Sequence, residues 1–177
     1  MKEASIKDAL RLFARYSRHA NEVLFGVLES LKEESLSEEA GSFFGSILGL
    51  LNHNLVAGIN WLNRFRHSGL SLPFLDTPAL DIQYPGFGKP LHHGLKELRD
   101  HQTDVDRLFL TLTEELTEPM MGTVIVYTKP DGEEVRRVAW QALLHVFNHQ
   151  THHRGQISQI LDSRGVEHDF SNLAAVL

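Results

Sequence analysis

Apolar residues recur at spacings of three and four along four long segments of the chain, with polar residues between them. The segments cover residues 5–32, 42–67, 91–117 and 138–163. This spacing places the apolar side chains of each segment on one face of an α-helix. The pattern therefore predicts four long amphipathic helices.

The connections between these segments differ in length. A polar, acidic stretch, residues 33–41, joins the first two segments. Residues 68–90 form a much longer loop that holds four of the six prolines, namely Pro73, Pro78, Pro85 and Pro90. Because loops of this length are uncommon unless they serve a site or cover a surface, we expect residues 68–90 to act as a lid or a specificity element.

The pattern changes after the third helical segment. In residues 122–137, Val124, Val126 and Thr128 alternate with Ile125 and Tyr127, and a Pro-Asp-Gly sequence at 130–132 supplies a tight turn. We predict a small β-hairpin there. Gly165 is a natural residue just past the end of the last helix, and we expect residues 172–177 to form a short terminal helix.

The second helical segment contains residues that favour helix ends and residues that weaken helix formation. Ser42 is a suitable N-terminal cap and Gly69 a suitable stop. Inside the segment, Gly45, Gly49 and Gly58 each weaken helix formation by about 1 kcal/mol relative to alanine. We interpret these glycines as positions where another helix comes close.

Helices with one apolar face each bury those faces against one another. We therefore predict an all-α four-helix bundle with a small β-hairpin before the last long helix. The whole chain, residues 1–177, is expected to form a single domain, because chains of this length keep one core. The long 68–90 connection allows the chain to cross the bundle instead of making a tight antiparallel turn.

Composition excludes several classes of function. A formal net charge of -6 gives no gain from counterion release on a polyanion, so nucleic acid is not an expected partner. The longest apolar stretch, residues 43–56, is interrupted by glycine, asparagine and histidine and is too short to span a membrane. The chain has no cysteine, which excludes disulfides and thiolate ligands and fits the reducing cytoplasm where we expect the protein.

Histidines are numerous and unevenly placed. The chain has 11, and His145, His149, His152 and His153 lie close together in the fourth helical segment. Spacings of four put His145, His149 and His153 in one row, on a face that also carries apolar residues. One interpretation is a set of core histidines bonded to other side chains; the other is a metal site, because imidazole is a common ligand and two imidazoles one turn apart converge on one ion. The spacing leaves open whether 145/149 or 149/153 would be the pair.

A third ligand would come from another helix. His53 is the best candidate, because it lies in the middle of the second helical segment in apolar surroundings. The remaining histidines lie nearer helix ends, loops or polar faces, and we expect them to be solvated: His19, His67, His92, His93, His101 and His168.

Two stretches resemble the DinB/YfiT-like metalloenzyme family, the DinB superfamily. Residues 144–157, which contain the histidine cluster, are similar to the fourth-helix motif of that family. Residues 51–62, in which His53 is followed two turns later by Trp61, resemble its second-helix motif. The order of elements, three helices, a hairpin and then the histidine helix, is also similar, so the resemblance covers nearly the whole chain.

The resemblance implies an up-down-down-up helix bundle and a specific set of ligands. His53, His149 and His153 match the three family ligands, and they imply one divalent metal ion per chain, such as nickel or zinc. It also implies a homodimer. Characterised members of the family include transferases and isomerases that use low-molecular-weight thiols such as bacillithiol or mycothiol.

Other residues of the motif receive lesser roles. His145 or His152 would be a base or would support a ligand, and we favour His145 because His152 points away from the row. Gln156 shares the inward face and is expected to bond a ligand or a bound water. Arg154 points elsewhere and is expected to pair with an acidic group.

Three histidines on one ion leave coordination positions open, as in catalytic sites. The leading hypothesis is a metal-dependent transferase or isomerase that acts on a small electrophile, with a low-molecular-weight thiol as cosubstrate. A metal-dependent hydrolase is the enzymatic alternative, although its usual carboxylate base is not marked in either motif. The non-enzymatic alternative is a metal-bearing stress-response or interaction protein in which the ion holds two helices together.

Overall fold

Four long helices make up most of the described chain in this computed structural model, which describes residues 5–83, 86 and 88–177. They are α1 (Ile6–Glu29), α3 (Ile47–Arg66), α4 (Leu95–Glu115) and α6 (Ala139–Ser163). Pro85, one of the prolines of the predicted loop, lies outside the described residues.

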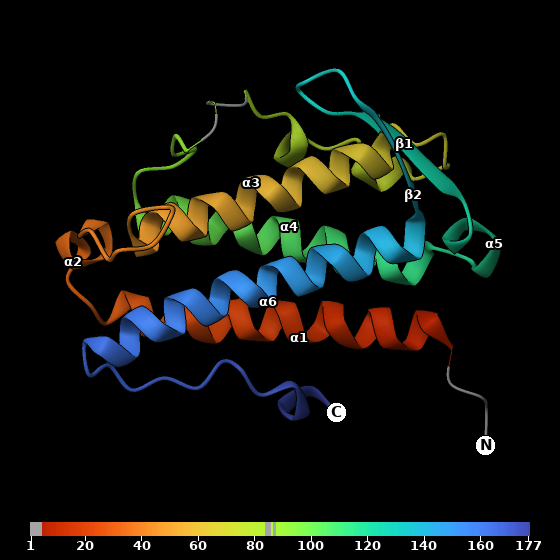
Figure 1. The fold of residues 1–177 in the computed structure, drawn as a ribbon. Helices are drawn as coiled ribbons and strands as arrows, with labels where there is room; N and C mark the ends of the chain where they lie inside the picture. Colours follow the sequence, from red (N-terminus) through yellow and green to blue (C-terminus); the bar gives the residue numbers. More distant parts are fainter. Residues whose placement is uncertain (1–4, 84–85, 87) are drawn as a thin grey trace.

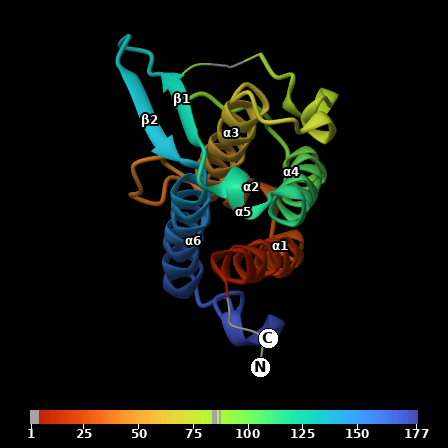
Figure 2. The same ribbon diagram turned by 90° about the vertical axis from the view of Figure 1, so that its right-hand side faces the viewer.

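The long helices form a ring when viewed end on. α1 packs against α4 and α6, and α3 packs against the same two helices (Figure 2). Followed along the chain in Figure 1, α3 and α4 run in one direction, and α1 and α6 run in the other. The predicted all-α bundle with up-down-down-up connectivity is therefore confirmed. Its core contains the fully buried rings of Phe65, Phe109 and Phe147.

The predicted hairpin is also confirmed. β1 (Val124–Thr128) and β2 (Glu134–Val138) pair antiparallel, with Tyr127 opposite Val135. Gly132, in the turn between them, has a φ of 88°, a conformation that glycine adopts without steric cost. The hairpin lies over the end of α3 (Figure 1).

Several short helices lie between the long helices or after the last one. α2 (Glu33–Ser37) and α5 (Glu118–Met121) are α-helical, and η1 (Pro73–Leu75), η2 (Pro78–Leu80) and η3 (Leu173–Val176) are 3₁₀ turns. α2 falls in the stretch that we expected to be only a polar connection. η3 is the expected short terminal helix. No helix among the described residues is long and apolar enough to cross a membrane.

The start of the second long helix differs from the prediction. α3 begins at Ile47 and is capped by the Ser46 hydroxyl, not by Ser42. Gly41 and Gly45 have φ values of 68° and 77°, which a helix cannot contain, so residues 41–46 form a separate turn. α4 likewise begins at Leu95, after Gly94, rather than at residue 91.

The three glycines of the second segment have different roles. Gly45 lies outside α3, so its interpretation as a helix contact is wrong. A Cβ atom on Gly49 would lie 1.9 Å from the carbonyl oxygen of Phe44, so its neighbour is the preceding turn and not a helix. Only Gly58 meets another helix, because its Cβ would lie 3.3 Å from Val105 of α4.

The connection between α3 and α4 is held by specific contacts. The Arg66 guanidinium forms ion pairs with Asp76 and Asp81, and Asn63 donates to the carbonyl oxygen of Leu80. The helices α3 and α4 are parallel and begin at the same end of the bundle. The chain must therefore run back along the length of the bundle between them (Figure 1).

The contact at Gly49 gives a testable prediction. Gly49→Ala should destabilise the protein by about 1–3 kcal/mol, because the new methyl group meets backbone that cannot move without displacing the turn. Gly26→Ala is the matched control: no atom lies within 4 Å of its added Cβ, so this change should be neutral or stabilising, by up to about 1 kcal/mol. Urea unfolding of both variants measures the difference; equal stabilities would contradict the prediction.

Candidate metal centre

Three imidazoles meet between α3 and α6. The Nε2 atom of His149 lies 3.1 Å from Nε2 of His53 and 3.2 Å from Nε2 of His153. Ligand nitrogen atoms of all three residues lie within 4.8 Å of one another. Bonds of 2.0–2.1 Å to one ion would place neighbouring nitrogens about 3 Å apart, so the observed separations fit a shared coordination sphere.

The helices explain why these side chains converge. His149 and His153 are one turn apart on α6, so their rings lie on the same face. His53 lies two turns into α3, which packs against that face. Asn54, the neighbour of His53, donates to the backbone carbonyl of Gln150 and so ties the two helices together next to the site.

The protonation states of the three histidines suit the binding of a cation. Burial and the neighbouring imidazoles lower the pKa of His53 and of His149 to about 4, so both rings are neutral at pH 7. The Oε1 atom of Gln156 lies 2.7 Å from Nδ1 of His153, and because a carbonyl oxygen only accepts, Nδ1 carries the proton. His153 therefore presents the lone pair of Nε2 to the centre. The expectation that Gln156 bonds a ligand residue agrees with this contact.

An aromatic ring covers two of the three histidines on one side. The Phe44 ring stacks on His53 with 3.9 Å between centroids and meets His153 edge-on at 5.5 Å. Phe44 belongs to the turn at 41–46, whose Gly45 donates to the carbonyl of Ser42. Sequence patterns did not identify Phe44; the only signal was a pair of phenylalanines between two glycines.

The His145 side chain does not point into the core as expected. It is exposed, whereas His149 is half-buried and His153 is buried. The His145 ring lies 6.0 Å from His149 and 5.4 Å from Trp61. Partial burial and the positive charges of Arg64 and Arg137 lower its pKa. His152 is exposed, as its position off the row predicted.

Three histidines expected to be solvated have partners instead. His101 lies 2.9 Å from His92 and 2.7 Å from the carbonyl oxygen of Ala79. His168 lies 2.6 Å from the Ser158 hydroxyl. Each contact joins a helix to a residue outside that helix, so spacing along one helix could not reveal them.

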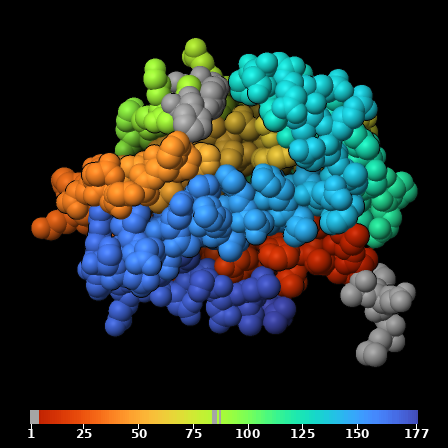
Figure 3. Space-filling view, viewed as in Figure 1, coloured from red at the N-terminus to blue at the C-terminus, as the bar shows by residue number. Residues whose placement is uncertain are grey.

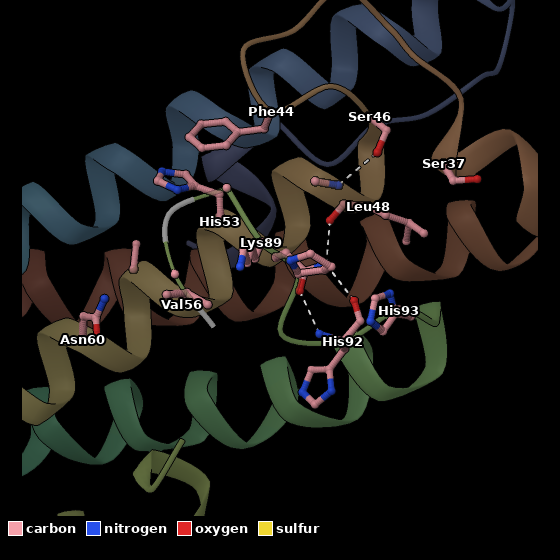
Figure 4. Close-up of a pocket in the computed structure, with 16 residues that line it drawn as sticks. Ser37, Phe44, Ser46, Leu48, His53, Val56, Asn60, Lys89, His92 and His93 are labelled. Carbon is pink, nitrogen blue, oxygen red and sulfur yellow. Dashed lines mark hydrogen bonds between the residues drawn. The ribbon is translucent and has the colours of Figure 1, made fainter. Parts of the chain in front are cut away.

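A cavity of about 500 Å³ opens beside His53 (Figure 4). Its walls come from α3 and from the described residues of 86–93, including Lys89 and His93. Asn52 holds that segment in place, because its side chain accepts from the backbone N–H groups of Leu91 and His92. The end of the long loop therefore lies at the candidate site.

Arg154 belongs to a buried network behind the histidines. Its guanidinium is 2% exposed and donates to Ser17 and Asn21 of α1. Asn21 in turn donates to the carboxylate of Asp106 in α4, which also accepts from Gln102. Arg154 thus reaches its expected acidic partner through an amide rather than directly. This network joins three helices and fixes α6 directly behind His153.

Known proteins resemble this chain over most of its length. A model of the DinB family matches residues 4–173. Protein DinB of Bacillus subtilis (strain 168) is 27% identical over 157 residues, which cover 89% of this chain and 86% of the relative.

The buried carboxylate predicts a pH dependence of stability. Burial raises the pKa of Asp106 from 3.8 to about 6, so the folded state holds the proton more tightly than the unfolded state. The free energy of unfolding should therefore fall, relative to Asp106→Asn, as pH rises through this interval, by on the order of 3 kcal/mol. Urea unfolding of both proteins across that range measures the difference. A difference that grows with pH would show that Arg154, not burial, controls this group.

Proposed function

Because the chain belongs to the DinB family, we propose that it binds one divalent metal ion on His53, His149 and His153 and acts as a metal-dependent enzyme. The proposed reaction is a transfer or isomerisation of a small electrophile, with a low-molecular-weight thiol as cosubstrate. The observation that carries the proposal is the meeting of three neutral imidazole nitrogens at separations that suit one ion.

The donor set suits nickel, zinc or a similar ion. Imidazole accepts several first-row divalent ions, so the ligands alone do not select one. A divalent ion held there would lower the pKa of a bound thiol or water and so supply a nucleophile at neutral pH. Three neutral ligands leave the charge of the ion uncompensated, which strengthens this effect.

The chain's own residues would control access and proton transfer. Phe44 covers His53 and excludes water from that side. His145 is the proposed base: it stands 6.0 Å from His149, and its lowered pKa leaves it neutral and able to accept a proton. Among the described residues, no carboxylate joins the three imidazoles, which favours thiol chemistry over hydrolysis.

Two expectations stay predictions. The family resemblance implies a homodimer, and this structure contains a single chain. The absence of cysteine fits the cytoplasm, where low-molecular-weight thiols stay reduced.

Metal binding is the first test. Protein purified without a histidine tag should contain one divalent ion per chain by elemental analysis. His149→Ala should lower the affinity by about a hundredfold or more, since loss of a residue that only supports a ligand already costs up to that factor. His152→Ala is the matched control, because this exposed neighbour is outside the group of three. Full metal content in His149→Ala would contradict the ligand assignment.

Thiol binding is the second test. Calorimetric titration of metal-loaded protein with a low-molecular-weight thiol should show saturable binding that metal removal abolishes. His145→Gln should keep this binding but slow turnover by a factor of about 10²–10⁴, the usual contribution of a general base. Stoichiometric metal without thiol binding would reject the thiol part of the proposal.

A further inference from the structure

Arg64 lies in the corner formed by two nearly perpendicular aromatic rings at the edge of the candidate site. Its Cζ atom lies 4.3 Å from the ring centroid of Trp61 in α3 and 3.8 Å from that of Tyr127 in β1. Contact with both ring faces restricts the position of the guanidinium and leaves N–H groups on its edge free to donate.

Among the described residues, no carboxylate forms an ion pair with Arg64. Burial lowers the pKa of Arg64, and its interaction with Tyr127 opposes this effect. Arg66, two residues further on, forms ion pairs with both Asp76 and Asp81. Half-burying a guanidinium without an anion costs free energy, which a bound anion would recover.

The surroundings of Arg64 form a depression of their own. A cavity of about 530 Å³ is lined by Asn60, Asn63, Arg64 and His67 from α3 and by the hairpin around Tyr127. Asn60 also lines the cavity beside His53, so the two hollows are neighbours along α3. In Figure 3, atoms of α3 (gold) form the floor of a hollow between the hairpin (cyan) and α6 (blue).

One face of α3 connects the histidines to Arg64. His53, Val56 and Asn60 follow this face in Figure 4. Arg64 lies one turn beyond Asn60 on the same stripe. The eleven residues from His53 to Arg64 correspond to roughly 16 Å along a helix axis, so an elongated small molecule would span the distance.

We propose that Arg64 binds a carboxylate or phosphate group of the ligand whose reacting end lies at the three histidines. The ligand is then an elongated, anionic small molecule with its reacting group at the far end, as in an ω-mercaptoalkanoate. The link to the histidines rests on the proposed function, whereas anion binding by Arg64 does not. The stacked guanidinium offers two parallel donors, the geometry that a carboxylate or phosphate matches.

The alternative role of Arg64 is to attach the hairpin to α3 through stacking alone. Both roles require contact between Arg64 and the aromatic rings. Only the proposed role predicts that the free edge of the guanidinium binds an oxyanion. Binding of a simple anion therefore separates them.

The first experiment uses metal-free protein and needs no turnover. ¹⁵N-labelled protein is titrated with inorganic phosphate and, separately, with acetate, and the Arg64 Nε–H and Trp61 indole N–H signals are followed. We expect saturable shifts of both signals, with the stronger response identifying the preferred anion.

Two variants control this titration. Arg64→Gln should abolish the shift of the Trp61 signal. Arg66→Gln should preserve this shift, because it removes the same charge from an arginine that already forms ion pairs. Absence of saturable shifts in the wild-type protein, or an unchanged Trp61 response in Arg64→Gln, would overturn the proposal. The wild-type titration decides the matter by itself if Arg64→Gln does not fold.

The second experiment tests the link to the histidines. Metal-loaded protein is titrated by calorimetry with ω-mercaptoalkanoates of increasing length and with the corresponding amides. At the length that spans the hollow, the carboxylate should bind about tenfold or more tightly than the amide, and Arg64→Gln should remove this gain. No gain at any length would overturn the link. If the histidines bind no metal, the proposed function fails, but the phosphate titration still decides whether Arg64 binds anions.

Discussion

The candidate centre depends on one electrostatic constraint: lone pairs of neutral imidazoles that face one another at about 3 Å repel unless a proton or a metal ion lies between them. Each neutral ring carries a single N–H, and His153 uses its own on Gln156. The Nε2 atom of His149 faces both other rings but carries at most one proton, so an N–H group bridges only one of the two contacts. The proposed metal ion would accept a lone pair from each ring, and the bundle holds α3 and α6 at the separation that brings the three nitrogens together.

The rest of the fold maintains that separation. Asn54 bridges α3 to the α6 backbone, and Gly58 allows α4 to pack closely against α3. On the opposite side, Arg154 and its partners in α1 and α4 fix α6 through a buried chain of hydrogen bonds. A buried polar group without a partner costs free energy because it has lost its contacts with water. The network therefore favours one position for the helix that carries His149 and His153.

Much of the fold could be predicted because helix periodicity is a local signal. The ends of α1 and α6 agree with the prediction to within a few residues, and the Pro-Asp-Gly sequence marked the hairpin. The start of α3 was misplaced because Ser42 and Ser46 are both suitable caps, and only the positive φ of Gly45 decides between them. Backbone conformation of this kind depends on tertiary contacts that a linear pattern does not contain.

The three histidines were identified from spacing and family resemblance, but their surroundings were not. The exposure of His145 depends on how α6 is rotated in the bundle, which an apolar stripe defines only coarsely. Phe44 and Arg64 contact residues brought near them by the turn at 41–46 and by the hairpin. No repeat or spacing links such positions, so folding alone makes them neighbours.

The rim of the hollow and the bundle behind it are built from different parts of the chain. Phe44 and Tyr127 come from connecting segments, whereas the network of Arg154 and Asp106 lies inside the helices. Connecting segments tolerate change better than packed helices do. Descendants of one ancestral bundle can therefore diverge in the shape of this hollow through changes in a turn and a hairpin, while the helices that hold the three histidines stay intact.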